Sequence, residues 1–212
     1  MKIDTHVHTL EAPANCGKMS SRDTVRMYKD AGYDAIVITN HFKVGRDPKA
    51  FIDAYHLAQS EGSAIGLKTF FGIEHNYSGA DYLILGVDES FTYNRNLLNT
   101  RRFSKLKSSC HKAGGVIVQA HPCREKRGVK RFMLNQRTDG LEIMNGHPKH
   151  IANNHVAKAY AEILGIFGTA GSDCHFRKGA CRCAMIFEND IENEGQLAEE
   201  IKLRRYKIEQ YF

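Results

Sequence analysis

The chain has 212 residues, of which 42% are hydrophobic, and these values fit one large domain with a full core. Its net charge of +6 and its pI near 9.0 favour anionic partners. No apolar run approaches the roughly 20 residues of a membrane span, and the N-terminus lacks a signal-peptide pattern, so we expect a cytoplasmic protein. The six cysteines lack the spacing of a disulfide scaffold, and we expect reduced thiols.

Strand-like apolar runs and segments with helical spacing alternate along the chain. The runs cover residues 3–7, 35–39, 69–73, 82–87, 116–120, 141–144, 167–170 and 184–187. The helical segments cover residues 21–31, 48–61, 96–113, 153–164 and 194–203. Ser20 followed by Asp23 resembles a capping box, and Gly165 stands where a helix C-terminal cap belongs.

This alternation of strands and helices predicts an α/β fold with a parallel sheet. About seven strand units in a single domain, residues 1–212, favour a small (β/α) barrel over an open doubly wound sheet. Candidate metal ligands follow nearly every strand, which suits the carboxyl-end rim of a barrel better than the single crevice of an open sheet.

The most informative motif is the histidine pair His6 and His8 at the end of the first strand-like run. Alternate side chains of a strand point to the same side, so both imidazoles can converge on one metal ion. More candidates follow later strand-like runs: His41, Glu74, His121, Asp173 and His175. Imidazole nitrogens and carboxylate oxygens together suit Zn, Mn or Fe.

These motifs resemble the PHP family, which is named for polymerase and histidinol phosphatase domains. The resemblance lies in six stretches in order, at residues 4–9, 38–41, 71–74, 120–122, 140–145 and 170–175. It implies a distorted seven-stranded (β/α) barrel, similar to a TIM barrel, with two or three divalent metal ions that support phosphoester hydrolysis by a metal-bound hydroxide.

The resemblance also implies which residues bind metal. His6, His8, Glu74 and Asp173 match the ligands of a first metal, with Glu74 bridging to a second that His121 also binds. His41 and His175 match a third site. We expect Asp173 and these histidines at the catalytic centre, with His41, His121 or His175 as proton donor to the leaving group.

The chain departs from the family pattern in three places. Asn40 stands where the family usually has an aspartate, so it can orient a ligand but is a weaker candidate for binding metal. Some family members have a histidine or aspartate ligand shortly after the first motif, and Cys16 lies nearest to that position. It is a candidate thiolate ligand for the third metal, although a small buried residue without a metal is the alternative. Asp88 is a candidate replacement for a histidine that some members have after the fourth strand.

Basic residues follow two of the predicted ligands. Arg124 opens a stretch that continues with Lys126, Arg127, Lys130 and Arg131, and Arg177, Lys178 and Arg182 follow His175. Because a guanidinium matches two phosphate oxygens, Arg124 and Arg177 are candidates for binding the substrate phosphate. Few aromatic side chains accompany this charge, so a small phosphorylated substrate is favoured over a short oligonucleotide. No protein partner is evident.

Other polar residues receive a structural interpretation. Glu142 and Asn145 end a strand and are expected to orient ligands rather than bind metal. His75 should point away from the site because it follows Glu74 on a strand. Ordinary roles are also expected for His56, His111, His147, His150, His155, Cys181 and Cys183.

Three functions remain open at this point. The favoured one is a metal-dependent phosphoesterase, and the second is a degenerate domain that binds a ligand without turnover. The third is a hydrolase of C–N bonds, which usually needs a bridging lysine at a strand end. Lys18, Lys43 and Lys68 lie in turns or at strand starts and are poorly placed for that role.

Overall fold

The computed structural model describes residues 1–14, 16–125, 128 and 132–211. Within them ten strands form one sheet in the order β10-β9-β1-β2-β4-β5-β6-β7-β8, with β3 paired to β4. The strands are β1 (Lys2–Val7), β2 (Ala35–Ile38), β3 (His41–Phe42), β4 (Lys68–Tyr77), β5 (Ala80–Leu85), β6 (Val116–Gln119), β7 (Gly140–Asn145), β8 (Phe167–Gly171), β9 (Cys183–Phe187) and β10 (Tyr206–Gln210).

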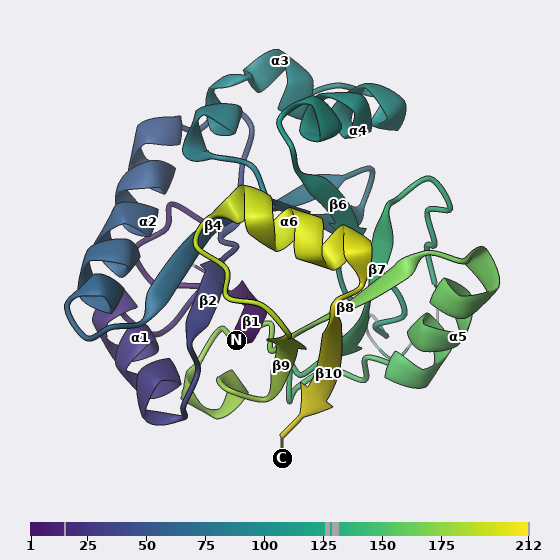
Figure 1. The fold of residues 1–212 in the computed structure, drawn as a ribbon. Helices are drawn as coiled ribbons and strands as arrows, with labels where there is room; N and C mark the ends of the chain where they lie inside the picture. The colour runs from purple at the N-terminus through teal and green to yellow at the C-terminus, as the bar shows by residue number, and fades with distance from the viewer. Residues whose placement is uncertain (15, 126–127, 129–131, 212) are drawn as a thin grey trace.

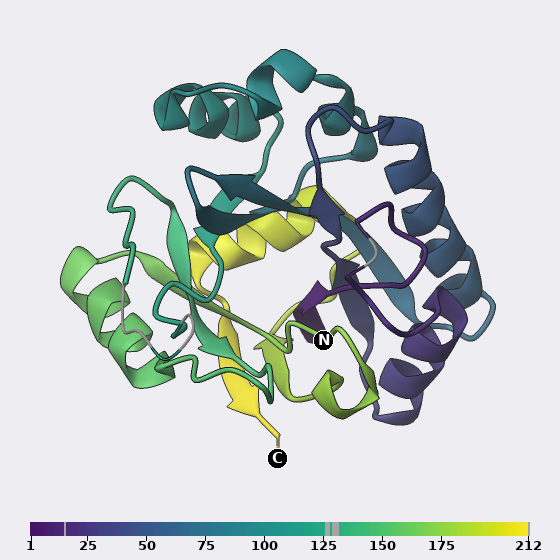
Figure 2. The ribbon, with the colours of Figure 1, turned by 180° about the vertical axis from the view of Figure 1, so that it is seen from behind.

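The sheet curls into a nearly closed barrel, as the two opposite views in Figures 1 and 2 show. After β8 the chain returns beside β1, where Val7 and Cys174 form a parallel bridge. The Thr5 hydroxyl donates to the Ala170 carbonyl at 2.9 Å across the same seam. The predicted distorted barrel is therefore confirmed.

Helices cover the outside of the barrel. They are α1 (Ser21–Asp30), α2 (Pro48–Ser63), α3 (Arg95–Leu98), α4 (Phe103–Lys112), α5 (Asn154–Leu164) and α6 (Glu194–Leu203), with 3-10 turns η1 (Glu89–Tyr93) and η2 (Arg177–Gly179). The helices α1 and α2 lie on one side and α5 on the other, while α6 crosses one mouth of the barrel (Figure 1). No helix in the described ranges is both long and apolar enough to cross a membrane.

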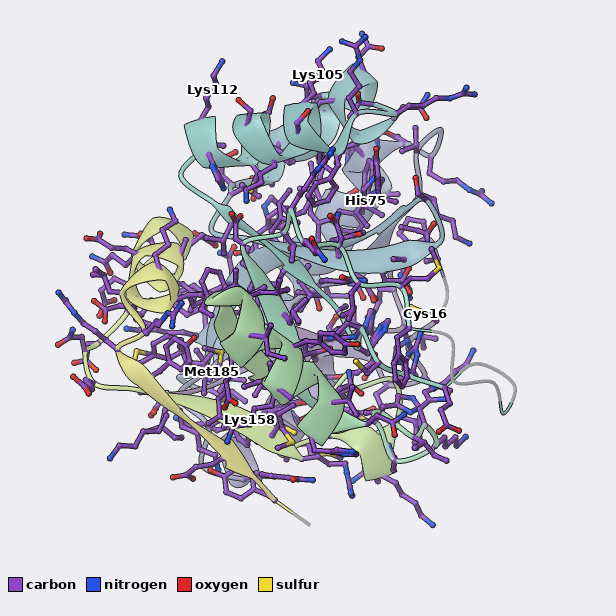
Figure 3. The ribbon with its side chains drawn as sticks, turned by 90° about the vertical axis from the view of Figure 1, so that its right-hand side faces the viewer. Cys16, His75, Lys105, Lys112, Lys158 and Met185 are labelled. Atoms are coloured by element: carbon purple, nitrogen blue, oxygen red, sulfur yellow. The ribbon has the colours of Figure 1, made fainter. Side chains whose placement is uncertain are left out.

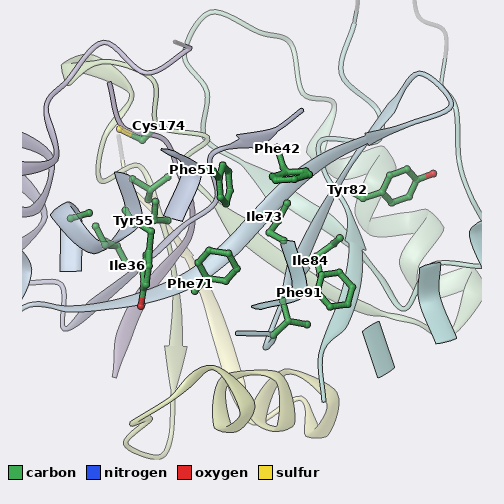
Figure 4. Packing of buried hydrophobic residues seen from close by; sticks show 14 of the residues in the cluster. Ile36, Phe42, Phe51, Tyr55, Phe71, Ile73, Tyr82, Ile84, Phe91 and Cys174 are labelled. Carbon is green, nitrogen blue, oxygen red and sulfur yellow. The ribbon is translucent and has the colours of Figure 1, made fainter. Parts of the chain in front are cut away.

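The outward faces of the strands pack against α1 and α2. Ile36 on β2 and Phe71 and Ile73 on β4 belong to one buried cluster with the α2 residues Phe51 and Tyr55 (Figure 4). The Phe51 and Phe71 rings meet edge to face with centroids 6.0 Å apart. Such pairs stabilise beyond the area they bury. Side chains alternate along a strand, so the β4 residues between those of this cluster, such as Phe70 and Glu74, point toward the barrel interior.

The interior of the barrel holds a second buried cluster that α6 completes. Ala35 and Val37 of β2 and Phe70 of β4 pack there with Leu197 and Ala198 of α6. These strand residues precede the metal-ligand candidates on their strands, so α6 closes the amino end of the barrel. The carboxyl end is left for polar residues.

The expected parallel sheet is wrong for β5 and β9, which pair antiparallel with their neighbours, and β3 and β10 lie outside the predicted strand runs. The strand β5 pairs antiparallel with both β4 and β6. Ser78 and Gly79 form the connecting turn with φ of 52° and 85°. Two positive φ values in a two-residue loop match the twist of a β-hairpin. A second difference is that the predicted helix over 96–113 is divided into α3 and α4.

Candidate metal centre

The first ligand pair lies where the sequence predicted it. His6 is the penultimate residue of β1 and His8 directly follows the strand, and their ring centroids are 5.1 Å apart. Glu74 points inward from β4, and Asp173 follows β8. All four side chains are buried.

Four buried polar atoms at this point have no hydrogen-bond partner among the described residues. They are Nε2 of His6, Nε2 of His8, Oε2 of Glu74 and Oδ1 of Asp173. Both imidazole nitrogens lie 3.3 to 3.6 Å from the two carboxylate oxygens. Ligands of a tetrahedral metal at about 2.1 Å are about 3.4 Å apart. Unpartnered polar atoms are costly to bury, so these donors fit a divalent metal ion.

A second group of possible ligands shares Glu74. Nε2 of His121 lies 3.1 Å from Oε1 of Glu74 and 3.9 Å from Oδ2 of Asp81. Glu74, Asp81 and His121 together could hold a metal ion. Asp81 was not predicted as a site residue. Asp81 lies near the start of β5, opposite Asn76 on β4, and so comes close to Glu74. A hairpin turn at Ser78–Gly79 was the feature of the sequence that could have predicted this position.

A third group brings together His8, Cys16, His41 and His175. The Sγ atom of Cys16 lies 3.6 Å from Nδ1 of His8. Burial acts to raise the pKa of the Cys16 thiol, but hydrogen bonds with His175 and His8 outweigh it and lower the pKa to about 5. A thiolate is the form of cysteine that binds metal.

Charges within the cluster stabilise one another. Burial favours the neutral form of Glu74 and Asp173, but nearby histidines, above all His6, lower the pKa of both carboxylates well below the usual range. The pKa of His175 rises to about 10 because its contacts with Asp173 and Cys16 outweigh its burial. The centre therefore holds ionised carboxylates and a thiolate. Their negative charge is balanced by protonated histidines, and divalent cations can take the place of those protons.

Two of the ligand candidates have unusual backbone conformations. The φ angles of His121 and Asp173 are 30° and 50°. Left-handed conformations of residues other than glycine cost of order 1–3 kcal/mol and cluster at functional sites. Each residue lies two positions after a short strand, β6 or β8, where the chain turns at the rim.

Glu142 and Asn145 on β7, which the sequence analysis expected to orient ligands, form hydrogen bonds with the ligand candidates. Nδ1 of His6 donates to Oε1 of Glu142 at 2.9 Å, and the backbone N–H of His121 donates to Oε2 at 2.8 Å. The amide of Asn145 donates to Glu142 at 3.0 Å and to Asp173 at 3.4 Å.

Asp4 ties the strand ends together behind the ligands. Its carboxylate accepts the backbone N–H groups of His6 and Ser172 at 3.1 and 3.0 Å and the hydroxyl of Tyr28 at 2.8 Å. Burial raises its pKa to about 6 despite these bonds. Asp4 thereby fixes the end of β1 against the end of β8.

The centre opens into a cavity of about 410 Å³. It is lined by Cys16, Lys18, His41, Glu74, His121, Arg124, His147, Lys149, His150, Asp173, His175 and Phe176. His147 and His150, which we expected to have ordinary roles, thus lie at the mouth, because the loop after β7 folds back over the rim. Their rings stack with centroids 4.2 Å apart. Burial lowers the pKa of His147 to about 4, so this imidazole is neutral.

Arg124 reaches two of the ligand candidates. Its guanidinium nitrogens lie 3.3 Å from Asp173 and 3.8 Å from Asp81. Arg177 begins η2, is exposed and does not line the cavity. The further basic residues Lys126, Arg127, Lys130 and Arg131 lie outside the described residues.

The comparisons with known proteins agree with this geometry. A family model described as the PHP domain matches residues 4–176. The chain belongs to the PHP family. A second model, described as PHP-associated, matches residues 152–206. A search of curated proteins gave no match.

Solved structures with a similar fold cover most of the chain. PsfC from Pseudomonas syringae has a TM-score of 0.61 and 18% identity, over 100% of this chain and 91% of the other. A protein from Bifidobacterium adolescentis, provisionally described as a metal-dependent phosphoesterase, has a TM-score of 0.59 and 17% identity over 95% and 96%. An amidohydrolase from Chromobacterium violaceum, solved with sulfate and without metal, has a TM-score of 0.52 and 12% identity over 82% and 88%. At these identities the likeness concerns the fold.

Two departures of this PHP domain can be followed in its structure. Asn40 accepts the Thr9 backbone N–H at 2.8 Å, and its amide donates to the Thr9 hydroxyl at 3.1 Å. It therefore fixes the segment after His8, whereas an ionised aspartate could only accept from the Thr9 hydroxyl and could not donate to it. Asp88 is exposed and caps η1 by accepting the Ser90 N–H at 2.8 Å. Asp88 as a ligand is wrong because the reversed β5 carries it to the other end of the barrel.

Proposed function

We propose that this PHP domain, as a single unit over residues 1–212, is a hydrolase that cleaves a phosphoester in a small anionic substrate with the help of two or three divalent metal ions. The observation that carries the proposal is the convergence of four buried, unpartnered ligand atoms from His6, His8, Glu74 and Asp173. A domain that had lost its metal would not be expected to retain so costly an arrangement.

We assign the metal ligands as follows. A first ion would be held by His6, His8, Glu74 and Asp173, a second by Glu74, His121 and Asp81, and a third by Cys16, His41 and His175. Zn, Mn and Fe all suit this mixture of imidazole, carboxylate and thiolate donors. Bound metal would supply Lewis-acid chemistry, activating water and neutralising phosphate oxygens.

The residues around the ions bind and orient the substrate. Arg124 reaches over Asp81 and Asp173 and can place two guanidinium N–H groups on phosphate oxygens. His41, His121 and His175 all line the cavity and remain the candidates for protonating the leaving group. A cavity of about 410 Å³ fits a small phosphomonoester or a nucleotide better than a polymer. The exposed Arg177 is no longer a favoured phosphate ligand.

The alternatives have less support. Three lysines were considered for C–N hydrolysis. Lys68 pairs with Glu192 at 2.7 Å at the start of β4, and Lys43 does not line the metal cavity. Lys18 does line the cavity, but it lies in the loop after β1 and not at a strand end. A degenerate domain was suggested by Asn40, which has a well-defined structural role. The six free cysteines fit the reducing cytoplasm, where we expect the enzyme.

The test combines metal content with turnover. Mass spectrometry of protein supplied with Mn or Zn should find at least two ions per chain, and fewer in a His6→Ala, His8→Ala variant. A panel of phosphomonoesters should then be hydrolysed, and Arg124→Ala should lose activity that Arg177→Ala keeps. Metal binding without turnover on any phosphoester would support the ligand-binding alternative, and substoichiometric metal would contradict the metal centre itself.

A further inference from the structure

A second depression, of about 490 Å³, lies on the outer side of β3 and β4 beside the segment that joins α3 to α4. It shares no lining residue with the metal cavity. His75 on β4 and Phe42 on β3 contribute to it, whereas their neighbours Glu74 and His41 face the metal centre. Figure 3 shows His75 between the level of Cys16 and the helix that carries Lys105.

His75 is the buried polar group of this depression. Only 3% of its surface is exposed, and its Nδ1 atom has no hydrogen-bond partner among the described residues. The alternation along β4 turns its ring away from the metal ligands, as the sequence predicted. A buried nitrogen of this kind needs a polar partner, and an ordered water or a ligand in the adjoining depression would supply one.

The other polar lining residues favour an anion. Lys43 and Arg101 are exposed cations among the lining residues, and Asn99 and Thr100 add an amide and a hydroxyl group. None of the described lining residues is a carboxylate. Guanidinium and ammonium groups beside neutral donors are the usual surroundings of a bound oxyanion.

We propose that this depression is a second anion-binding site, for a phosphate-like oxyanion held by Lys43, Arg101 and His75. The site is distinct from the proposed metal centre and does not depend on its activity. Its ligand is either a free anion or the distal anionic group of a substrate whose phosphoester lies at the metals.

The site contacts the metal centre through one side chain. Asn76 is among the residues that line the depression, and its side-chain amide donates to Oδ1 of Asp81 at 2.7 Å. Asp81 lies near His121 in the second group of possible metal ligands. In addition, β3 and β4 pair in a register that sets His41 opposite Glu74 and Phe42 opposite His75. An anion that engages Asn76 would therefore change how Asp81 is held.

Binding of inorganic phosphate to metal-free protein tests the proposal. The protein should carry Arg124→Ala, so that the metal cavity does not contribute. Titration calorimetry should detect one site, and NMR of the imidazole groups should show a shift of the His75 signals. Adding Lys43→Ala and Arg101→Ala should weaken binding about tenfold or more. The matched control, Lys105→Ala with Lys112→Ala, removes two exposed cations of α4 that do not line the depression and should leave binding unchanged.

A flexible diol bisphosphate separates the two sources of the anion. In protein that keeps Arg124, tighter binding of the bisphosphate than of phosphate, lost in the Lys43→Ala, Arg101→Ala variant, would indicate a distal substrate group. Equal affinities would indicate a free anion. Phosphate binding that survives both substitutions, or that leaves the His75 signals unmoved, would overturn the proposal.

Discussion

Nδ1 of His6 donates a hydrogen bond of 2.9 Å to Glu142 inside the barrel. This bond sets the tautomer of His6 and turns its unpartnered Nε2 toward Glu74 and Asp173. The same carboxylate accepts the backbone N–H of His121. One side chain on β7 therefore orients ligands that come from two other strands. Loss of a partner that orients a metal ligand typically weakens metal affinity about 10- to 100-fold.

The substitution Glu142→Gln should weaken metal binding by about 10- to 100-fold. The ring N–H of His6 and the backbone N–H of His121 both donate to the Glu142 carboxylate. A glutamine amide has one oxygen and one NH2 group, so one of these donors would face another donor. Calorimetric titration of metal-free protein with Zn or Mn measures the effect. Glu199→Gln on the exposed face of α6 removes the same charge far from the site and should bind metal normally. Equal affinities for the two variants would contradict the orienting role.

Asp81→Asn should reduce the metal content of the protein by lowering occupancy of the second site. Ligand atoms of Asp81, His121 and Glu74 surround the proposed second metal site. An amide is a poorer ligand than a carboxylate for these ions. Metal analysis after dialysis gives the stoichiometry. Asp88→Asn is the matched control, because Asp88 caps η1 and should leave metal content unchanged. The assignment fails if Asp88→Asn loses more metal than Asp81→Asn.

Cys16 should be the reactive thiol of the metal-free protein. Its pKa is lowered to about 5, so it is already a thiolate at neutral pH, and alkylation by iodoacetamide should be nearly constant from about pH 6 to about pH 8. An ordinary thiol would react about tenfold faster per pH unit over that range. Burial raises the pKa of the partly exposed Cys181 to about 12 and keeps it unreactive.

Mass spectrometry of the labelled peptides identifies the modified residue. Cys16→Ser should abolish the fast reaction, and prior addition of Zn should slow it. Labelling that rises steeply with pH, or that Zn leaves unaffected, would argue against a thiolate ligand at this position.

The sequence contained the local part of this architecture. His6 and His8 could be placed on one side of β1 because a strand has a period of two, and the same rule turned Glu74 inward and His75 outward. The direction of β5 was not apparent, because an apolar run has the same pattern in a parallel and an antiparallel strand. That single reversal exchanged Asp88 for Asp81 at the rim. The position of His147 depends on how a loop folds back, which no local pattern encodes.

Gly86→Ala should destabilise the fold far more than Gly79→Ala, although both glycines have positive φ, 80° and 85°. A Cβ on Gly79 meets nothing within 4 Å, so the cost there is the left-handed conformation alone, roughly 1–2 kcal/mol. A Cβ on Gly86 would collide with the Cβ of Ala198 and lie 3.1 Å from the Glu194 carbonyl oxygen, both on α6. Overpacking of that kind adds roughly 1–3 kcal/mol. Urea unfolding of metal-free protein measures the difference in free energy, and an unchanged slope would assign it to the folded state. If the two variants unfold at the same urea concentration, α6 does not depend on this close approach to close the amino end of the barrel.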